Sequence, residues 1–368
     1  MMRLIGLRAL AMAIASLALV LASCGETVET AHFRADAART GFYPDGDAPT
    51  LTEVSFTYDA ESPIYSSPVV HRGYVVFGTV SGKVISLDAR SGEERWSYQT
   101  RGPVNSSAAI GGGTVYVGCA DGYVYALDEM TGQRRWRRRA GAGVSSAPLL
   151  VDETVYVGGT DGRLHALSAV DGATIWERDL GGAISSSPAL AEGLLCVGTW
   201  EGELVALEPD SGKEVWTAGL DDAIATTPAI ADSFVFFGSQ DGNFVVVFRE
   251  TGIEMGRMPI DAPISASPAV WGRRVCFASW DHAAYALDLD TGDLAWTYQA
   301  GGAIYSSPTV SGGRVYFGSG DHHVHAIDAE TGEPVSAYET GGRVNSSPCI
   351  WRNTLYVGSE DGVLYAIR

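Results

Sequence analysis

The chain has 368 residues, of which 45 are glycine and 36 are aromatic (11 Phe, 9 Trp and 16 Tyr), and its hydrophobic content is 46%. This hydrophobic content excludes a disordered low-complexity chain. Acidic residues outnumber basic ones by 44 to 25, which gives a net charge of −19, and only Lys83 and Lys213 are lysines. An acidic chain with so few lysines binds phosphate backbones poorly, so we expect no nucleic-acid partner. The length allows two or three domains, or one large all-β fold.

Residues 1–23 have the composition of a secretory signal. Arg3 and Arg8 precede an apolar and small-residue run over residues 9–22, and no acidic residue occurs before Cys24. The run is shorter than the roughly 20 apolar residues of a membrane span. It ends in Leu-Ala-Ser-Cys, which resembles a bacterial lipobox, where the Cys becomes the lipidated N-terminus of the mature protein.

We therefore expect a lipoprotein signal peptide over residues 1–23, a lipid on Cys24 and a tether over residues 24–48. The alternative is an ordinary signal that happens to end beside an unmodified Cys. Gly25 stands where an Asp would retain a Gram-negative lipoprotein in the inner membrane. This resemblance implies a cell-envelope protein that is lipid-anchored at the outer membrane and faces the periplasm.

The rest of the chain repeats every 40 residues, and self-comparison finds no insertion. A Ser-Ser-Pro triplet or a close variant recurs eight times, starting at residues 66, 106, 146, 186, 226, 266, 306 and 346. A second series ends in Gly or, once, Ala, at residues 78, 118, 158, 198, 238, 278, 318 and 358. Repeats of ~40 to 45 residues are typical of β-propeller blades.

Each unit is predicted to contain four short strands. In the seventh unit these are Tyr305–Val310, Arg314–Gly318, His323–Asp328 and a last strand after the Ala329–Glu333 loop. Asp-Gly pairs such as those at residues 121–122 and 241–242 predict tight type I′ hairpins, which use the abundant glycine.

The two ends of the repeat region complement each other. The last unit stops at Arg368 after three strands, whereas Thr52–Ala60 matches the fourth strand of the repeat in phase. An N-terminal strand is thus predicted to complete the C-terminal blade and to leave no open sheet edge between the ends. The expected fold is all-β: one eight-bladed propeller over residues 49–368, with no second domain.

The connection between the third and fourth strands resembles the tryptophan-docking motif of PQQ-type propeller repeats, Ala-x-Asp-x-x-Thr-Gly-x-x-x-Trp, where PQQ is pyrroloquinoline quinone. In that family the indole wedges between neighbouring blades. The resemblance implies a blade-docking role for five tryptophans: Trp96, Trp136, Trp176, Trp216 and Trp296. Gly256, Ser336 and Phe56 occupy the Trp position elsewhere, so those three interfaces are expected to be less tightly packed.

Two branches of this family differ in function. PQQ-dependent dehydrogenases are larger and carry an adjacent Cys-Cys pair, a Ca²⁺ site and a catalytic Asp in long insertions, which this chain lacks. A small lipoprotein made only of the ring resembles instead the BamB family of the outer-membrane β-barrel assembly machinery. Residues His32–Gly41 also resemble the stretch that precedes the propeller in many PQQ-repeat lipoproteins.

Several polar clusters have both a structural and a functional interpretation. Cys119, Cys196, Cys276 and Cys349 lie in or beside strand runs and are best read as buried small residues. His282 and His322 follow an Asp at equivalent turns of adjacent blades, with His323 and His325 nearby. They could hold a metal, but His also tolerates positive φ in place of a turn glycine, so no metal site is predicted.

The residue before each Ser pair is expected to line one mouth of the central funnel. Tyr65, Asn105, Tyr305 and Asn345 give one half of this ring aromatic and amide groups, and Ser or Ala occupies the other half. These four residues could contact a small ligand. They could equally fill the channel and hydrogen-bond the tops of the blades.

Two further features suggest protein contacts. Trp200 and Trp280 stand at tight turns on the same rim, where exposed aromatic side chains favour a partner. The only basic cluster falls on an outermost strand and comprises Arg134, Arg135, Arg137, Arg138 and Arg139. Its charges could prevent edge-to-edge strand pairing. They could equally bind an acidic protein partner or anionic lipid.

Together these features favour a lipid-anchored, non-catalytic propeller scaffold, monomeric within a complex and without a cofactor. The resemblance implies a protein partner in the envelope, such as the barrel subunit of the outer-membrane assembly machinery. The alternative is a sensor or quinoprotein enzyme that binds PQQ or another small ligand in the funnel.

Overall fold

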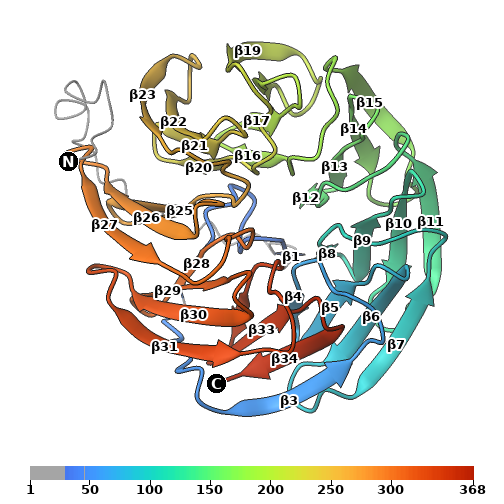
Figure 1. Cartoon of the computed structure of the whole chain (residues 1–368). Helices are drawn as coiled ribbons and strands as arrows, with labels where there is room; N and C mark the ends of the chain where they lie inside the picture. The colour runs from blue at the N-terminus through green and yellow to red at the C-terminus, as the bar shows by residue number, and fades with distance from the viewer. Residues whose placement is uncertain (1–29, 45) are drawn as a thin grey trace, which may run out of the picture.

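A computed structural model of the chain describes residues 30–44 and 46–368. These residues form eight β-sheets arranged radially around a central channel, with no helix among them (Figure 1). The prediction of an all-β, eight-bladed propeller is confirmed. Within the described part of the chain, no helix is long and apolar enough to cross a membrane.

The eight blades follow one another along the chain, and each runs from an inner strand at the channel to an outer strand at the periphery. The strands of blades 1 to 4 are β4 (Val69–His71), β5 (Tyr74–Gly78), β6 (Lys83–Asp88), β7 (Glu94–Gln99); β8 (Ala109–Gly111), β9 (Thr114–Gly118), β10 (Tyr123–Asp128), β11 (Arg134–Arg139); β12 (Leu149–Val151), β13 (Thr154–Gly158), β14 (Arg163–Ser168), β15 (Thr174–Asp179); and β16 (Ala189–Ala191), β17 (Leu194–Gly198), β18 (Glu203–Leu207), β19 (Glu214–Gly219).

Blades 5 to 8 repeat the same pattern, and the last one takes its outer strand from the N-terminal part of the chain. Their strands are β20 (Ala229–Ala231), β21 (Phe234–Gly238), β22 (Asn243–Phe248), β23 (Glu254–Pro259); β24 (Ala269–Trp271), β25 (Arg274–Ala278), β26 (Ala283–Asp288), β27 (Leu294–Gln299); β28 (Thr309–Ser311), β29 (Arg314–Gly318), β30 (His323–Asp328), β31 (Pro334–Glu339); and β32 (Cys349–Trp351), β33 (Thr354–Gly358), β34 (Val363–Ile367), β3 (Val54–Asp59).

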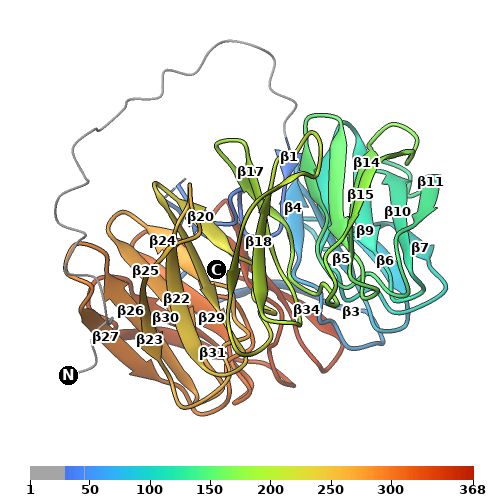
Figure 2. The same ribbon diagram turned by 90° about the horizontal axis from the view of Figure 1, so that it is seen from above.

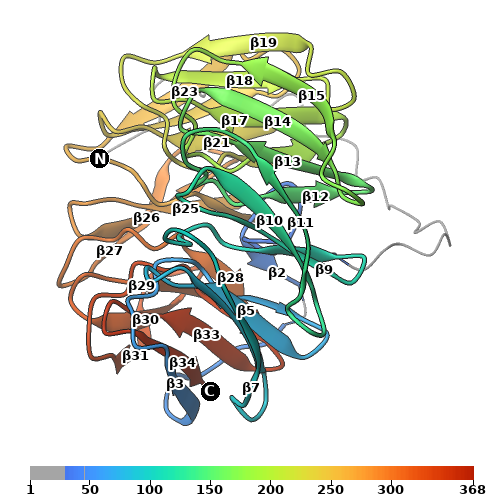
Figure 3. The same cartoon turned by 90° about the vertical axis from the view of Figure 1, so that its right-hand side faces the viewer.

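The N-terminal closing strand is where the repeat phase placed it. β3 pairs antiparallel with β34, with Phe56 opposite Ala366 and Asp59 opposite Val363. Figure 3 shows β3 and β34 side by side at the seam of the ring. Because the last blade is completed by the first long strand, both ends of the ring are held by hydrogen bonds within one sheet.

Two local expectations were wrong. The inner strand of blade 7 begins at Thr309 instead of Tyr305, since Pro308 has no N–H to donate and the Ser306 hydroxyl bonds the backbone of Gly318. The Asp-Gly turns are not type I′, because only the glycine has positive φ, as in Gly242 at +83°. Its N–H donates to the Ser239 carbonyl at 3.1 Å, which gives a longer turn closed by one left-handed glycine.

The Ser-Ser-Pro motif builds a belt of hydrogen bonds around the channel. The second hydroxyl of each pair accepts the backbone N–H of the equivalent residue one blade earlier, as Ser107 does from Ser67 at 2.9 Å. The same bond recurs between successive blades through the hydroxyls of Ser187, Thr227, Ser267, Ser307, Ser347 and Ser67. Ala147 has no hydroxyl and interrupts the belt between blades 2 and 3.

The hydrophobic core lies between adjacent blades. Between blades 5 and 6, for example, the rings of Phe244 and Phe277 stack with centroids 4.1 Å apart and are fully buried. The middle strands are buried on both faces, so their sequences are continuous apolar runs, whereas the outer strands alternate between buried and exposed residues. Each blade therefore packs on both neighbours, and the ring is one structural unit.

Candidate functional site

The ring has two faces with different loops. The rim face carries the connections from each outer strand to the next inner strand, such as residues 300–308, and the turns between the second and third strands. The turn face carries the short turns between the first and second strands and the loops between the third and fourth strands. Figure 2 shows the ring from the side, with loops gathered at both faces.

The N-terminal segment fills the channel between these faces. β1 (Thr30–Ala31) adds an antiparallel fifth strand to blade 2, and β2 (Phe42–Tyr43) adds a parallel one to blade 7. Figure 1 shows the segment in blue across the centre of the ring. Its carbonyl groups at residues 37, 38, 40 and 41 accept the N–H groups of Leu190, Ile230, Val270 and Val310, at 2.8 to 2.9 Å.

We call residues 30–43 the channel segment. The sequence placed them in the tether, yet they bind the inner strands of blades 2 and 4 to 7. Self-comparison could not detect this arrangement, because the segment has no counterpart in the repeat. The only signal in the sequence was the resemblance of His32–Gly41 to the stretch that precedes the propeller in related lipoproteins.

Two buried arginines hold the channel segment in place. Arg39 has no exposed surface and donates to the carbonyls of Pro188 at 3.0 Å, Pro148 at 2.9 Å and Phe33 at 2.5 Å. Arg34 donates across the channel to the carbonyls of Pro268 and Pro308. Neither residue was singled out from the sequence. Burial lowers the pKa of Arg39 to about 9 and that of Arg34 to about 10, so both remain charged near neutral pH.

His32 lies close enough to Arg39 for the guanidinium charge to act on its imidazole. Its side chain is buried and its Nδ1 atom has no hydrogen-bond partner. Burial, and secondarily the charge of Arg39, lowers the pKa of His32 to about 3. The channel segment therefore carries an imidazole that is neutral at physiological pH.

The four predicted funnel residues lie on the rim face but do not form one site. Asn345 donates to Glu360 at 2.7 Å, and burial followed by the charge of Glu360 raises the pKa of Tyr65. Tyr65 and Tyr305 are 40% and 37% exposed, and Asn105 is also exposed. The structure thus brings Tyr65 and Asn345 together around Glu360, which the sequence analysis did not identify.

The two rim tryptophans are both accessible. Trp200 is 53% exposed and donates its indole N–H to Ser185 at 2.6 Å. Trp280 is 37% exposed and its ring lies 4.9 Å from that of Tyr305, measured between centroids. Because these rings are held by neighbours, they present fixed aromatic surfaces to solvent.

The five predicted docking tryptophans share one geometry. Each indole N–H donates to a backbone carbonyl 33 residues later in the next blade, at 2.8 to 3.0 Å, from Trp96, Trp136, Trp176, Trp216 and Trp296. Each ring also covers the loop glycine of that blade; a Cβ on Gly172 would lie 2.7 Å from the ring of Trp136. At the Ser336 position no indole is present, and the Ser336 hydroxyl is buried without a partner.

The arginine cluster follows β11 at the periphery of blade 2. Arg135 bonds Asp128 at 2.8 Å, Arg138 bonds Thr174 of blade 3 at 3.0 Å, and Arg134 bonds Tyr98 of blade 1 at 3.2 Å. The guanidinium of Arg137 lies 4.8 Å from the ring centroid of Tyr123. A groove of about 770 Å³ separates this strand from blade 3, and its polar lining includes Arg137, Arg138, Arg139, Asp161, Arg163 and Asp179.

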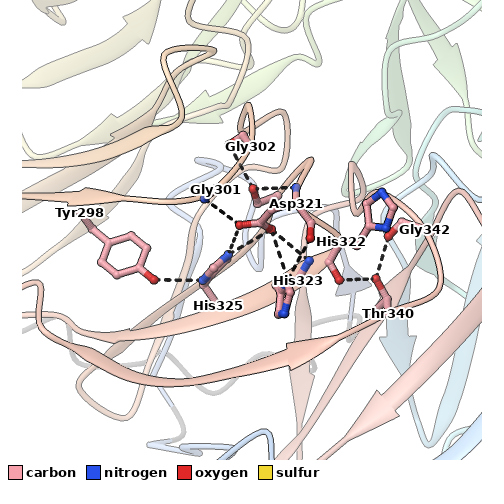
Figure 4. Close-up of polar contacts among 10 residues, drawn as sticks. Tyr298, Gly301, Gly302, Asp321, His322, His323, His325, Thr340 and Gly342 are labelled. Atoms are coloured by element: carbon pink, nitrogen blue, oxygen red, sulfur yellow. Dashed lines mark hydrogen bonds and ion pairs between the residues drawn. The ribbon is translucent and has the colours of Figure 1, made fainter.

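The histidines of blade 7 form a hydrogen-bonded network. Figure 4 shows His325 between Asp321 and Tyr298, with contacts of 3.0 Å and 3.1 Å. Burial lowers the pKa of His325, although Asp321 opposes this. At the equivalent position in blades 2, 6 and 8, a Tyr hydroxyl donates to the Asp, as Tyr125 does to Asp121. His325 therefore replaces a recurring tyrosine that braces the turn.

His282 and His322 occupy turn positions with φ of +72° and +69°, where other blades have glycine. Across the residues that the structure describes, no group of three or more His, Cys, Asp or Glu side chains is arranged to hold a metal ion. Cys119, Cys196, Cys276 and Cys349 are free and buried, and burial raises the pKa of each thiol. A buried thiol with a raised pKa is a poor nucleophile.

The fold is shared with proteins of different function. A structure titled BamB from Moraxella catarrhalis has 21% identity and a TM-score of 0.72, and the match covers 85% of this chain and 98% of that one. A quinohemoprotein alcohol dehydrogenase from Comamonas testosteroni has 17% identity and a TM-score of 0.80, covering 91% and 79%. The computationally designed protein Ika8 has 18% identity and a TM-score of 0.76, covering 87% and 99%.

These identities show the fold alone, and a search of the curated proteins gave no match. One sequence-family model matches the chain. It is the family of the outer membrane protein assembly factor BamB, and it matches residues 47–182, 160–255 and 243–368. These ranges span the whole ring. The chain therefore belongs to the family of the outer membrane protein assembly factor BamB.

Proposed function

We propose that this protein is a lipid-anchored, non-catalytic scaffold of the cell envelope that takes part in outer-membrane protein assembly. Membership of the BamB family supports the role, and the lipobox-like sequence that ends at Cys24 supports the anchor. The main structural support for the proposal is a set of exposed aromatic side chains on the rim face. Trp200, Trp280 and Tyr305 are exposed there and are held in place by neighbouring side chains.

The rim aromatics suit a protein partner better than a small ligand. Exposed Trp and Tyr rings that lose little conformational freedom on binding are common at the centre of protein interfaces. The channel beneath them is crossed by residues 30–43, which bond directly to the inner strands. We therefore place the partner, an envelope protein such as the barrel subunit of the assembly machinery, on the rim loops.

The alternative is a quinoprotein function, because the fold is shared with a quinohemoprotein dehydrogenase. The described residues do not fit a PQQ site of that kind. The chain has no adjacent cysteines, and the funnel groups Tyr65 and Asn345 are engaged with Glu360. No arrangement of carboxylates suited to Ca²⁺ occurs among the described residues. We accordingly propose that the protein works without a cofactor.

Co-purification from detergent-solubilised membranes tests the scaffold role. We expect the wild-type protein to recover an outer-membrane assembly component and a Trp200→Ala, Trp280→Ala double variant to recover at least tenfold less. Ile253→Ala, an exposed residue on the turn face of blade 5, is the matched control and should recover as much as wild type. Recovery of no such component with the wild-type protein would contradict the proposed role.

Titration with PQQ and Ca²⁺, followed by absorbance, tests the alternative. Saturable binding that disappears in a Tyr65→Ala, Tyr305→Ala double variant would overturn the cofactor-free scaffold. For the anchor, Cys24→Ser should move the protein from the membrane fraction to the soluble envelope fraction. Unchanged membrane association of that variant would contradict lipidation at Cys24.

A further inference from the structure

The loops on the turn face differ in charge from one side of the ring to the other. The exposed residue at the tip of the loop between the third and fourth strands is Arg90 in blade 1, Met130 in blade 2 and Val170 in blade 3. In blades 4 to 7 the same position is always acidic: Asp210, Glu250, Asp290 and Glu330. Met130 and Val170 are 64% and 73% exposed, and Ile253 on the blade 5 loop is 63% exposed.

The basic part of this face adjoins the apolar part. Arg134 and Arg135 begin the outer strand of blade 2, directly after its loop, and both are exposed. Asp128 is bonded to Arg135, so this pair adds no net charge, and Glu93 and Asp171 are the exposed acidic residues of the neighbouring loops. We call Arg90, Met130, Arg134, Arg135 and Val170 the exit surface.

The first described residue of the chain, Thr30, lies on the same side of the ring as the exit surface. Thr30 pairs with Gly111 at the end of the inner strand of blade 2, so the described part of the chain begins at the turn face. Gly111 also lines a partly apolar hollow of about 270 Å³ whose walls include Leu150, Arg135 and Val170; Asp152 and Glu153 are its acidic residues.

The length of the chain before Thr30 limits where an anchor on Cys24 can lie. Five residues lie between Cys24 and Thr30, and the six Cα–Cα steps from Cys24 to Thr30 span at most about 21 Å when fully extended. A four-stranded blade extends about 14 Å from its inner to its outer strand. This reach is longer than the radial width of one blade, so it covers the loops of blade 2.

From this combination we infer that the exit surface faces an anionic phospholipid membrane. The inference rests on the lipid anchor of the proposed function. Arg90 and Arg134 complement anionic headgroups, and Met130 and Val170 enter the interfacial region. Asp210 and Glu250 on the loops of blades 4 and 5 are repelled by the same headgroups, which tilts the ring and turns those blades away from the membrane.

Site-specific fluorescence in vesicles tests this orientation. The lipidated protein is reconstituted with vesicles of phosphatidylcholine and phosphatidylglycerol, and an environment-sensitive dye is attached at Met130→Cys or Val170→Cys. The native cysteines in the ring are buried, so the introduced thiols react selectively. Asp210→Cys and Glu250→Cys are matched controls at the same position of the repeat.

We expect a severalfold rise in dye emission on blades 2 and 3 and no rise on blades 4 and 5. An Arg90→Glu, Arg134→Glu, Arg135→Glu variant should lose at least half of that rise while remaining attached to the vesicles. Equal emission at all four positions, or no rise at any, in protein that stays with the vesicles overturns the orientation alone. Equal attachment of wild type and Cys24→Ser to the vesicles would contradict the lipid anchor, and the proposed orientation would fail with it.

Discussion

Removing one docking indole should destabilise the whole ring by a measurable amount. Trp296 is 6% exposed, its ring covers Gly332 of the next blade, and its N–H donates to the Ala329 carbonyl at 3.0 Å. Burial of about 200 Å² of indole at 25 cal/mol per Å² contributes about 5 kcal/mol. Partial collapse of the cavity reduces the loss, so Trp296→Ala is expected to cost about 3 to 5 kcal/mol.

Calorimetry can measure this loss of stability as a lower melting temperature, Tm. At about 2.1 cal/mol/K per residue, the unfolding entropy of the ring is about 0.7 kcal/mol/K, so Trp296→Ala should lower Tm by about 4 to 7 °C. Ser336→Ala is the control, since Ser336 occupies the same repeat position without an indole and its buried hydroxyl has no partner. That variant should melt within about 1 °C of wild type. A Trp296→Ala shift no larger than the control shift would refute the docking argument.

Three other changes probe the channel. Ala147→Ser supplies the missing hydroxyl of the belt and should add about 0.5 to 1.5 kcal/mol, measured as a rise in Tm; a lower Tm would count against the belt as a source of stability. Arg39→Met should speed hydrogen exchange at the amides of Leu190 and Ile230 at least tenfold, while blade 1 amides, which the channel segment does not bond, stay unchanged. Unfolded His32 binds a proton below about pH 6.5, whereas the folded residue stays neutral until about pH 3. Stability therefore falls as the pH is lowered through this window, by up to about 1.4 kcal/mol per pH unit. The difference between the Tm at pH 7 and the Tm at pH 4 should be smaller in His32→Phe than in wild type, and an unchanged difference would exclude His32 as the cause.

The ring was predictable because its signals recur eight times. A strand boundary or turn that is ambiguous in one unit is resolved by the others, and the phase of residues 52–60 predicts the closing strand that the structure contains. The turn type was predicted wrongly because an Asp-Gly pair fits both a type I′ turn and a longer turn that ends in a left-handed glycine. Sequence spacing alone does not distinguish these two geometries.

The channel segment and the pairing of rim groups could not be predicted in the same way. Arg34 and Arg39 bond carbonyl groups from four different blades, and main-chain carbonyls leave no trace in side-chain patterns. Glu360 joins Asn345 and Tyr65 across the seam where the last blade meets the first. Contacts of this kind depend on ring closure, which a list of repeats does not contain.

Ring closure also sets the order in which the protein can mature. The channel segment and β3 are synthesised first, but Phe42 pairs with Val310 and Asp59 with Val363, about 270 to 300 residues later. During synthesis the early strand therefore has an unpaired edge until the last strand emerges. Such long-range pairing makes folding slow, and a chain truncated before Val363 would lack the partner that β3 needs. The contact that seals the finished ring is thus the one that leaves the nascent chain exposed for longest.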